Sequence, residues 1–284
     1  MVEIKMKTTL TKENYKDNHE YMSYSRVSRF LSCEAAAAAN FRLPSSPAQL
    51  IGSYVDAYFS EEMEEFKQEH PEIYNSRTGE LKADFAKAND YIKRIEADEE
   101  MMHYLSGEKQ KIMTGEIYGI KFKIKMDSYL ENEAIVDLKI MRDFNRVWSD
   151  TFGRYVNFVQ AYDYDIELAI FQEIVYQNTG KKLPCYIVAI TKEEPSDVGI
   201  FEIPQDVLDE VMESLSKHLK RIKKIQDGEV APHRCEKCAY CRMTKKAQIM
   251  DYTLIGANGD QLREEGYECV DPKITKEEGE KVDE

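Results

Sequence analysis

Long apolar runs are missing from this sequence. No stretch of its 284 residues is long and apolar enough to cross a bilayer. The first 18 residues are polar and lack the apolar core of a secretory signal. We therefore expect a cytoplasmic protein that makes no use of a membrane.

The chain also lacks an excess of positive charge, with 39 basic against 53 acidic residues, and it has six cysteines. Six cysteines in a chain of this size do not suggest a disulfide framework, and in a reducing compartment clustered cysteines indicate metal or redox chemistry. The net charge of −14 argues against a general nucleic-acid binder. Basic residues nevertheless gather in three segments, which leaves a locally basic cleft open: Lys121–Lys125, Lys217–Lys224 and Arg234–Lys246.

The composition, 42% hydrophobic and 32% charged, is sufficient for one large domain or two small ones. Apolar periodicity and turn residues predict helices and strands in mixed order. The expected helices are 24–41, 48–68, 83–105, 155–178 and 205–228, and the expected strands are 118–130, 134–140, 184–192 and 198–204. This order predicts an α/β or α+β domain with a mixed sheet flanked by helices.

The predicted domain spans residues 23–247 and includes a cysteine-rich knot at 233–241. Residues 1–22 read as an irregular arm, and residues 248–284 as an acidic tail. From Asp260 onward the tail holds ten acidic and four basic residues, a composition typical of solvated segments. Ser46 is expected to cap the second helix, with Pro47 in its first turn.

The strand AIVDLKI places Asp137 and Lys139 on one face, because residues two apart in a strand point the same way. Asp127 lies on the preceding strand of an expected hairpin. Two carboxylates from neighbouring strands can bind one Mg²⁺, and a lysine beside them can position a water or stabilise a transition state. On spacing alone, charged residues on an exposed strand face are the commoner explanation.

Two further sets of polar residues are candidates. Gln160, Tyr164, Glu167 and Phe171 share one face of the expected helix 155–178, which fits either a functional stripe or the edge of a core. Asp56 lies on an amphipathic helix four residues after Gly52, where a surface acid is the default interpretation.

Three cysteines at C-x2-C-x2-C spacing, Cys235, Cys238 and Cys241, form the most specific pattern in the chain. Thiolates at this spacing bind one metal ion or one face of an iron–sulfur cluster. A fourth ligand is needed, and Cys33 is the best candidate. The rivals are His233, Cys185 and Cys269.

Together these motifs resemble the PD-(D/E)xK nuclease superfamily, and within it the RecB-like and RecE-like exonucleases of phages. The shared order is a helix with a serine–phenylalanine–cysteine motif from the region of Ser25 or Ser28 to Cys33, a glycine–acid helix from Gly52 to Asp56, Asp127 after a strand, the D-x-K strand of Asp137 and Lys139, and a glutamine–tyrosine helix. The resemblance covers about residues 20–245 and implies a restriction-endonuclease-like core.

The resemblance also implies roles for individual residues. Asp127 and Asp137 would bind catalytic Mg²⁺ or Mn²⁺, with Asp56 as a further ligand, and Lys139 would act on the attacking water. The glutamine–tyrosine motif would be filled by Gln160 and Tyr164 or by Glu167 and Phe171. Cys33, Cys235, Cys238 and Cys241 would hold a [4Fe-4S] cluster, with Zn²⁺ as the alternative.

The implied function is a metal-dependent exonuclease at duplex DNA ends, 5′ to 3′, with a single-strand annealing partner and a homo-oligomeric assembly. The expected DNA contacts are Lys121, Lys123, Lys125, Arg242, Lys245 and Lys246. Two rivals remain. One is a CRISPR-type or single-strand-preferring nuclease of the same fold, and the other is a non-catalytic DNA- or protein-binding module with a zinc knot.

Overall fold

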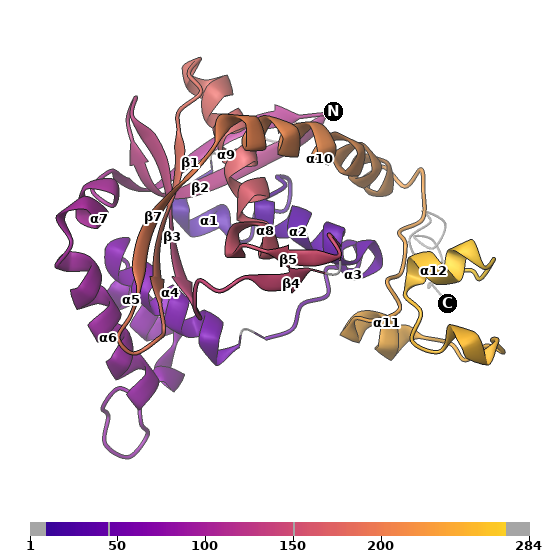
Figure 1. The fold of residues 1–284 in the computed structure, drawn as a ribbon, viewed down its shortest axis with the longest axis horizontal. Coiled ribbons are helices and arrows are strands. Elements are labelled where there is room, and N and C mark those ends of the chain that lie inside the picture. The colour runs from indigo at the N-terminus through magenta and orange to yellow at the C-terminus, as the bar shows by residue number, and fades with distance from the viewer. Residues whose placement is uncertain (1–9, 45, 150, 271–284) are drawn as a thin grey trace, which may run out of the picture. The chain divides into compact units, whose positions relative to one another are not determined.

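The computed structural model describes residues 10–44, 46–149 and 151–270, which form two compact units (Figure 1). The first unit combines the described part of Met1–Tyr21 with Ser45–Gly115 and Lys121–Glu213. The second combines Met22–Pro44 and Glu116–Ile120 with the described part of Ser214–Glu284. Within the described residues, no helix has the length and apolar character needed to span a membrane.

A five-stranded mixed sheet has the order β1-β2-β3-β6-β7, which confirms the predicted α/β fold. The pairs β2·β3 and β6·β7 are antiparallel, whereas β3 and β6 run parallel. The strands are β1 (Glu108–Ile117), β2 (Ile120–Leu130), β3 (Ala134–Met141), β6 (Cys185–Thr191) and β7 (Val198–Ile203). The sequence analysis missed β1, because the stretch EKQKIMTGEI lacks a clear alternation of apolar and polar residues.

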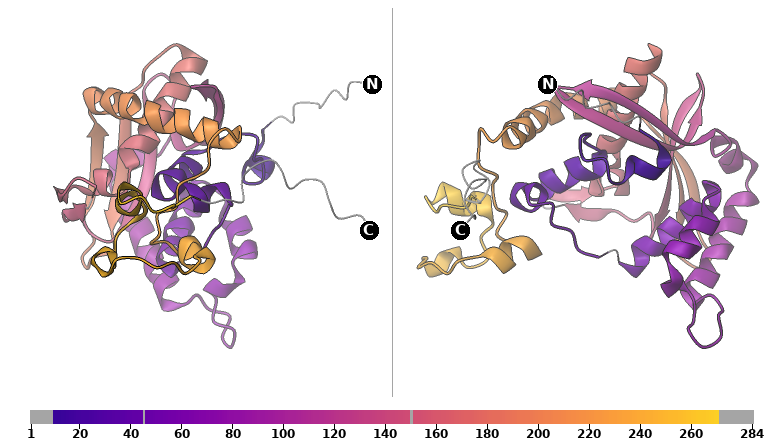
Figure 2. Two further views of the ribbon diagram at one scale, coloured as in Figure 1. Left: turned by 90° about the vertical axis from the view of Figure 1, so that its right-hand side faces the viewer. Right: turned by 180° about the vertical axis from the view of Figure 1, so that it is seen from behind.

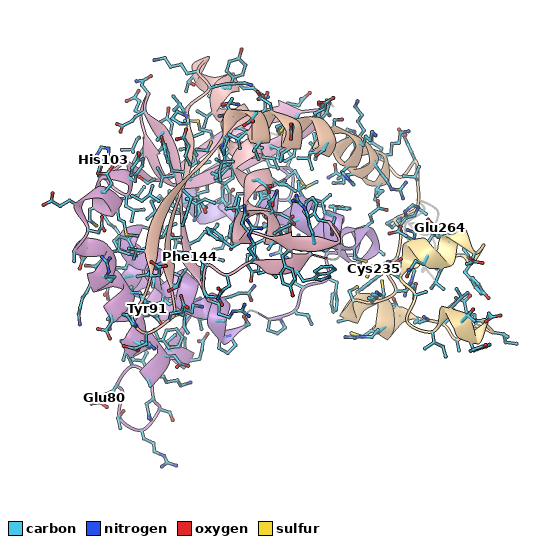
Figure 3. The ribbon with its side chains drawn as sticks, viewed as in Figure 1. Glu80, Tyr91, His103, Phe144, Cys235 and Glu264 are labelled. Atoms are coloured by element: carbon cyan, nitrogen blue, oxygen red, sulfur yellow. The ribbon has the colours of Figure 1, made fainter. Side chains whose placement is uncertain are left out.

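Helices cover both faces of the sheet (Figures 1 and 2). On one side, α4 (Pro47–Phe59), α5 (Met63–Glu69), α6 (Ala83–Glu96) and α7 (Glu99–Tyr104) form one core with Val136, Leu138, Val188 and Ile190. The short helix η1 (Pro71–Ile73) connects α5 to α6 through a loop that carries Glu80 (Figure 3). The helix α9 (Tyr164–Thr179) covers the other side and contacts β3.

This packing decides which face of β3 carries the candidate site. Val136 and Leu138 are buried against α4–α7, so the alternating residues Asp137 and Lys139 face α9. The predicted start of α4 is confirmed, because the Ser46 hydroxyl accepts a hydrogen bond from the Gln49 backbone N–H and Pro47 is the first helical residue.

The expected helix over 155–178 is interrupted in the structure. Residues Arg154–Val156 form strand β5, which pairs with β4 (Val147–Ser149), and Phe158–Ala161 form the short helix α8. Asp163 has φ 57° and ψ 31°, a left-handed conformation that cannot continue a right-handed helix. A new helix, α9, therefore begins at Tyr164.

The second unit also departs from the expected helix over 24–41. It is divided into α2 (Tyr24–Ser32) and α3 (Glu34–Ala38), because Cys33 is extended, with φ −165° and ψ 109°. The C-terminal part of α10 (Gln205–Gln226) contributes Arg221, whose guanidinium binds both carboxylate oxygens of Glu34 at 2.5 and 2.8 Å.

Both terminal segments are more ordered than expected where the structure describes them. The arm contains α1 (Lys12–Tyr15). The tail contains η2 (Tyr252–Leu254) and α12 (Gly259–Glu264), in which Leu262 is buried. The acidic stretch after residue 270 lies outside the described residues, and the predicted boundaries at residues 22 and 247 stay predictions.

Candidate active site and cysteine cluster

The Lys139 ammonium is held between two carboxylates in the first unit. Its Nζ atom lies 2.7 Å from Asp137 Oδ2 and 3.0 Å from Glu167 Oε2. The side chains are 19% exposed for Lys139, 6% for Asp137 and 15% for Glu167. Strand β3 supplies Lys139 and Asp137 and helix α9 supplies Glu167, so the crossover through α9 between the parallel strands β3 and β6 brings Glu167 to β3.

A second pair of carboxylates lies beside this group. Asp127 on β2 accepts a hydrogen bond from the Leu138 backbone N–H at 2.9 Å, which ties it to β3. The side-chain amide of Gln110 lies 3.4 Å from Asp127 Oδ1 and 3.5 Å from Asp56 Oδ1, and donates to Ser60 Oγ at 2.7 Å. The β2–β3 hairpin and α4 therefore bring Asp56 and Asp127 to one buried amide.

Sequence reasoning missed Gln110. It is 2% exposed and has φ 53°, an uncommon backbone conformation for a residue other than glycine. Strained backbone often marks functional sites, and here it lies at the point where the Gln110 amide meets two carboxylates. A lone glutamine in an unrecognised strand carries no signal that could have identified it.

Burial and crowding of negative charge shift the pKa values in this site. Burial, and then the charge of Asp127, raises the pKa of Asp56 to about 7. Burial also raises the pKa of Asp137, although the Lys139 ammonium acts in the opposite direction. The Lys139 pKa is raised despite the opposing effect of burial, because Asp137, Glu167 and Asp127 favour its charged form.

Two tyrosines lie near the Lys139 group, which consists of Lys139, Asp137 and Glu167. The Lys139 ammonium lies 4.6 Å from the centre of the Tyr164 ring, and burial raises the pKa of Tyr164 to about 12. Burial and then the charge of Glu167 raise the pKa of Tyr15, a residue of the N-terminal arm that the sequence analysis did not select. The arm therefore reaches the neighbourhood of Glu167.

These residues fit a divalent cation. Asp137 Oδ2 is buried and lies 2.7 Å from the Lys139 ammonium, and Asp56 and Asp127 both lie within 3.5 Å of the Gln110 side-chain amide. Oxygen ligands of this kind suit Mg²⁺ or Mn²⁺, which keep several waters. In the part of the chain that the structure describes, no three carboxylates converge tightly, so two carboxylates and water would complete such a site.

The expectation that Gln160 shares a helix face with Tyr164 and Glu167 is wrong. The break at Asp163 places Gln160 on α8, where it lines a separate cavity of about 670 Å³ with Phe144, Phe158 and Phe201. Phe171 is 5% exposed and packs in the core. Of the four residues in the predicted stripe, Tyr164 and Glu167 lie at the Lys139 group.

The three lysines of β2 that were predicted to contact DNA differ in their exposure. Lys123 is 5% exposed, and its ammonium donates to the backbone carbonyls of Tyr15 and Asn18. Lys121 is exposed and pairs with Glu20, whereas Lys125 is half-buried. The buried ammonium of Lys123 removes the support for its predicted DNA contact.

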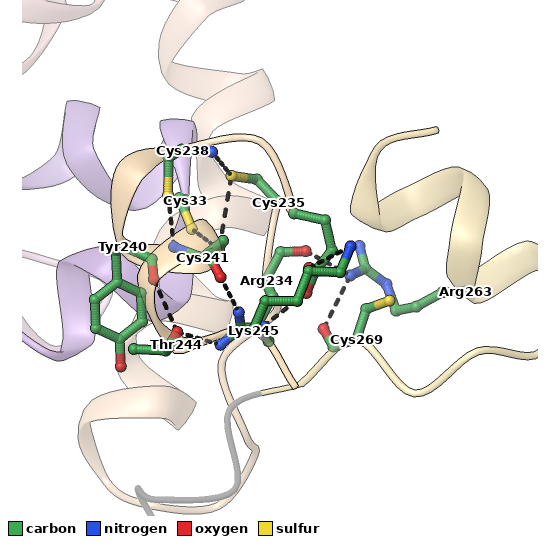
Figure 4. Close-up of polar contacts among 11 residues, drawn as sticks. Cys33, Arg234, Cys235, Cys238, Tyr240, Cys241, Thr244, Lys245, Arg263 and Cys269 are labelled. Atoms are coloured by element: carbon green, nitrogen blue, oxygen red, sulfur yellow. Dashed lines mark hydrogen bonds and ion pairs between the residues drawn. The ribbon is translucent and has the colours of Figure 1, made fainter. Parts of the chain in front are cut away.

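The second unit brings Cys33, Cys235, Cys238 and Cys241 together (Figure 4). Their sulfurs all lie within 4.8 Å of one another, with 3.6 Å between Cys33 and Cys241 and 3.9 Å between Cys235 and Cys241. The extended backbone at Cys33 and the start of α11 (Ala239–Thr244) place sulfurs from distant segments at one point. The four cysteines could bind a metal ion.

The backbone around the cysteines is fixed by Arg234 (Figure 4). Its guanidinium donates to the Cys241 carbonyl at 2.6 Å and to Thr244 Oγ1 at 2.8 Å, and pairs with Glu236 at 2.6 Å. The amides of Cys238 and Cys241 donate to the sulfurs of Cys235 and Cys238, at 3.3 and 3.4 Å. Donors of this kind stabilise thiolates, the form that binds metal.

The rival ligands lie outside this cluster of four sulfurs. Cys185 is buried in β6 of the first unit, where burial raises its pKa. Cys269 is buried in the second unit, but it is not among the four converging residues, and neither is His233. Lys245 pairs with Glu236 at 3.4 Å, whereas Arg242 and Lys246 are exposed, and their DNA contacts stay predictions.

Comparison with known proteins agrees with this geometry. Residues 23–244 match the family described as "PDDEXK-like domain of unknown function (DUF3799)". The chain belongs to this PDDEXK-like family. The predicted superfamily is thereby confirmed, and membership in a PDDEXK-like family supports a nuclease.

Two solved structures are similar to this chain to different degrees. The crystal structure of a protein named "Putative exonuclease" from Eubacterium rectale is 41% identical, with a TM-score of 0.81, and the match covers 87% of this chain and 98% of that one. The structure of SSO0001 is 12% identical with a TM-score of 0.30, covering 80% of this chain and 96% of that one. No curated protein matches the chain significantly.

Proposed function

We propose that this PDDEXK-like protein is a divalent-metal-dependent exonuclease that hydrolyses phosphodiester bonds at the ends of duplex DNA. The observation that carries the proposal is the Lys139 ammonium between Asp137 and Glu167, with Asp127 on the adjacent strand. The similarity to a protein named as an exonuclease supports the same activity. A binding module has no need for a buried lysine so placed.

The chain's own residues would divide the work as follows. Asp127 and Asp137 would hold the cation. Asp56 would be a further ligand, because the Gln110 side-chain amide lies close to both Asp56 and Asp127. Lys139 would orient the attacking water and stabilise negative charge that develops on the phosphate. Glu167 would fix the position of the Lys139 ammonium, and the Tyr164 ring would cover it.

A bound divalent cation would supply Lewis acidity, activating water and neutralising the phosphate. The raised pKa of Lys139 keeps its ammonium charged at neutral pH, so it serves as a hydrogen-bond donor rather than as a base. Its fixed geometry makes donation possible without reorganisation during the reaction.

The test compares DNA degradation by the wild type and by the Asp137→Asn variant in Mg²⁺ or Mn²⁺. We expect the wild type to degrade linear duplex but not covalently closed circular duplex, and the variant to be at least about 100-fold slower. Thermal unfolding of the variant checks that it is folded. Equal degradation by both proteins, or none by either, would overturn the proposal.

Three finer predictions are part of this proposal. We predict cleavage from the 5′ end, which end-labelled substrates test. We also predict a single-strand annealing partner, which co-purification tests, and a homo-oligomer, which light scattering tests. Preference for single-stranded DNA would favour the CRISPR-type or single-strand-preferring alternative. Specific DNA or protein binding without cleavage would favour the zinc-knot module.

We propose that the four cysteines bind one Zn²⁺ ion rather than a [4Fe-4S] cluster. Four thiolates at about 2.3 Å from one tetrahedral ion lie about 3.8 Å apart. The sulfur separations of 3.6 and 3.9 Å agree with this value. In a four-iron cluster each thiolate bonds a different iron, so the sulfurs would lie farther apart.

Metal analysis of anaerobically purified protein tests this assignment. We expect one zinc per chain and colourless protein, with zinc lost in the Cys241→Ser variant. Iron at four per chain, brown colour and visible absorbance would establish the cluster instead. A chain with neither metal would contradict both assignments.

A further inference from the structure

The β4–β5 ribbon exposes aromatic side chains on a short two-stranded element of the first unit. Trp148 is 52% exposed, Phe152 50% and Tyr155 61%. Trp148 and Tyr155 are a cross-strand pair with ring centres 5.4 Å apart, and the Arg154 guanidinium lies 5.7 Å from the Phe152 ring. Exposed aromatics gathered with arginine usually mark a binding surface.

The charge of this segment differs from that of the whole protein. Residues 142–155 contain three arginines and two aspartates, whereas the chain as a whole carries a charge of −14. Arg142, Arg146 and Arg154 are all exposed, although Arg142 is paired with Asp143. A locally basic aromatic surface on an acidic protein favours a polyanionic ligand with stacking bases over an acidic or purely apolar partner.

The ribbon is linked to the candidate active site along the chain and through neighbouring elements that pack on one another. It connects β3, which carries Asp137 and Lys139, to α9, which carries Glu167. Strand β4 packs on α8, which ends just before Tyr162. The rings of Tyr162 and Tyr164 lie 5.8 Å apart, and Tyr164 covers the Lys139 ammonium.

We infer that the β4–β5 ribbon binds single-stranded DNA by stacking bases on Trp148, Phe152 and Tyr155, with Arg154 beside the phosphates. This inference rests on the proposed nuclease function and adds to the protein a binding surface for the unpaired DNA strand. Base stacking on aromatic rings is tolerant of sequence, as degradation of arbitrary DNA requires. Duplex DNA keeps its bases stacked inside the helix and cannot use the same surface.

The test measures binding without cleavage. Trp148 is the single tryptophan of the chain, so its fluorescence reports on the ribbon directly. We expect a thymidine oligonucleotide, added without divalent cations, to quench this fluorescence, and the quenching to weaken as salt rises. Gel analysis confirms that the oligonucleotide remains intact during the titration.

Substitutions locate the binding surface. Phe152→Ala and Tyr155→Ala should each weaken oligonucleotide binding by about tenfold, because each removes one stacking platform. Tyr176→Ala is the matched control, since Tyr176 is 45% exposed on α9 in the same unit but outside the ribbon. It should bind as the wild type does, and thermal unfolding verifies that all three variants are folded.

Three outcomes would overturn the inference: no quenching by the oligonucleotide, unchanged affinity in both ribbon variants, or an equal loss of affinity for blunt duplex and single strand. The last result would identify a general backbone contact. Binding is measured separately from hydrolysis. Normal DNA degradation without fluorescence quenching therefore rejects the inference about the ribbon but not the nuclease function. Quenching without any degradation rejects the nuclease function.

Discussion

The Lys139 ammonium lies within 3.0 Å of the Asp137 and Glu167 carboxylates and under the Tyr164 ring. The Lys139→Met variant keeps a side chain of similar length but removes the ammonium, so the proposed hydrogen-bond donor to the water and the phosphate is lost. We expect single-turnover DNA cleavage to fall by about 100- to 1000-fold.

Glu167→Gln is the informative companion to Lys139→Met. It retains a hydrogen-bond acceptor for Lys139, so its loss of cleavage should be smaller, about tenfold. Cleavage rates that are equal in the two variants would mean that Lys139 acts only by holding Glu167. Thermal unfolding separates a catalytic loss from a folding defect, because either change leaves a buried charge less well paired.

Asp165 gives a prediction for stability against pH. It is 8% exposed, and burial raises its pKa. A carboxyl whose pKa is raised in the folded state stabilises the fold when protonated, and this stability is lost as pH rises above about 4, the unfolded value, toward the folded pKa. Asp165→Asn should therefore raise the melting temperature at pH 7, with a difference that disappears near pH 4.

A melting temperature of Asp165→Asn below that of the wild type at pH 7 would contradict this reasoning. The asparagine can keep the hydrogen bond that the aspartate accepts from the Ile166 backbone N–H at 2.9 Å, through its side-chain oxygen. The comparison across pH therefore isolates the charge.

For single residues, the sequence predicted side-chain placement well where a regular strand makes alternate residues point to the same face. Alternation along β3 placed Asp137 and Lys139 on one face, and the structure has them there. Alternation could not predict that the N-terminal arm covers Lys123, nor that a left-handed backbone turns Gln110 toward Asp56 and Asp127. Those positions depend on contacts between segments far apart in the chain.

Two glycines on helices give opposite predictions at the scale of elements. Gly52 lies inside α4 with no atom within 4 Å of an added Cβ, so Gly52→Ala should stabilise the protein by about 0.5–1 kcal/mol. Gly259 begins α12, where an added Cβ would lie 1.8 Å from the Arg234 carbonyl oxygen, so Gly259→Ala should destabilise it by about 1–3 kcal/mol.

Thermal and urea unfolding of the two alanine variants measure both effects. The helical Gly52 variant controls for the general preference of helices for alanine. Equal shifts of the same sign would show that α12 does not pack closely against the backbone of Arg234.

Element boundaries were the least predictable feature. Helix propensity favoured one helix over 24–41, because five alanines follow Glu34, but Cys33 is extended. Propensity also favoured one helix over 155–178, although Asp163 breaks it. Both breaks lie beside candidate functional residues, where tertiary contacts override local preference, and the β4–β5 ribbon was missed for the same reason.

On the scale of the whole molecule, the two candidate sites belong to different compact units. Asp127, Asp137 and Lys139 lie in the first unit, and the four cysteines lie in the second. The cysteines come from segments near the start and near the end of the chain, so the proposed metal ion would close a loop of about 200 residues and would stabilise the second unit.

Removal of the metal therefore predicts a local response. After treatment with a thiol-reactive mercurial or a zinc chelator, amide hydrogen exchange should accelerate in α3, α11 and α12, while the amides of β3 and β6 stay protected. The reason is that α3 and α11 carry or flank the cysteine ligands, and α12 is tied to them where the Gly259 N–H donates to the Cys235 carbonyl at 3.0 Å. The Cys185→Ser variant, changed at a buried cysteine of the first unit, should respond to chelator as the wild type does. Exchange that accelerates equally in β3 and β6 would show that the metal stabilises the whole fold as one cooperative unit.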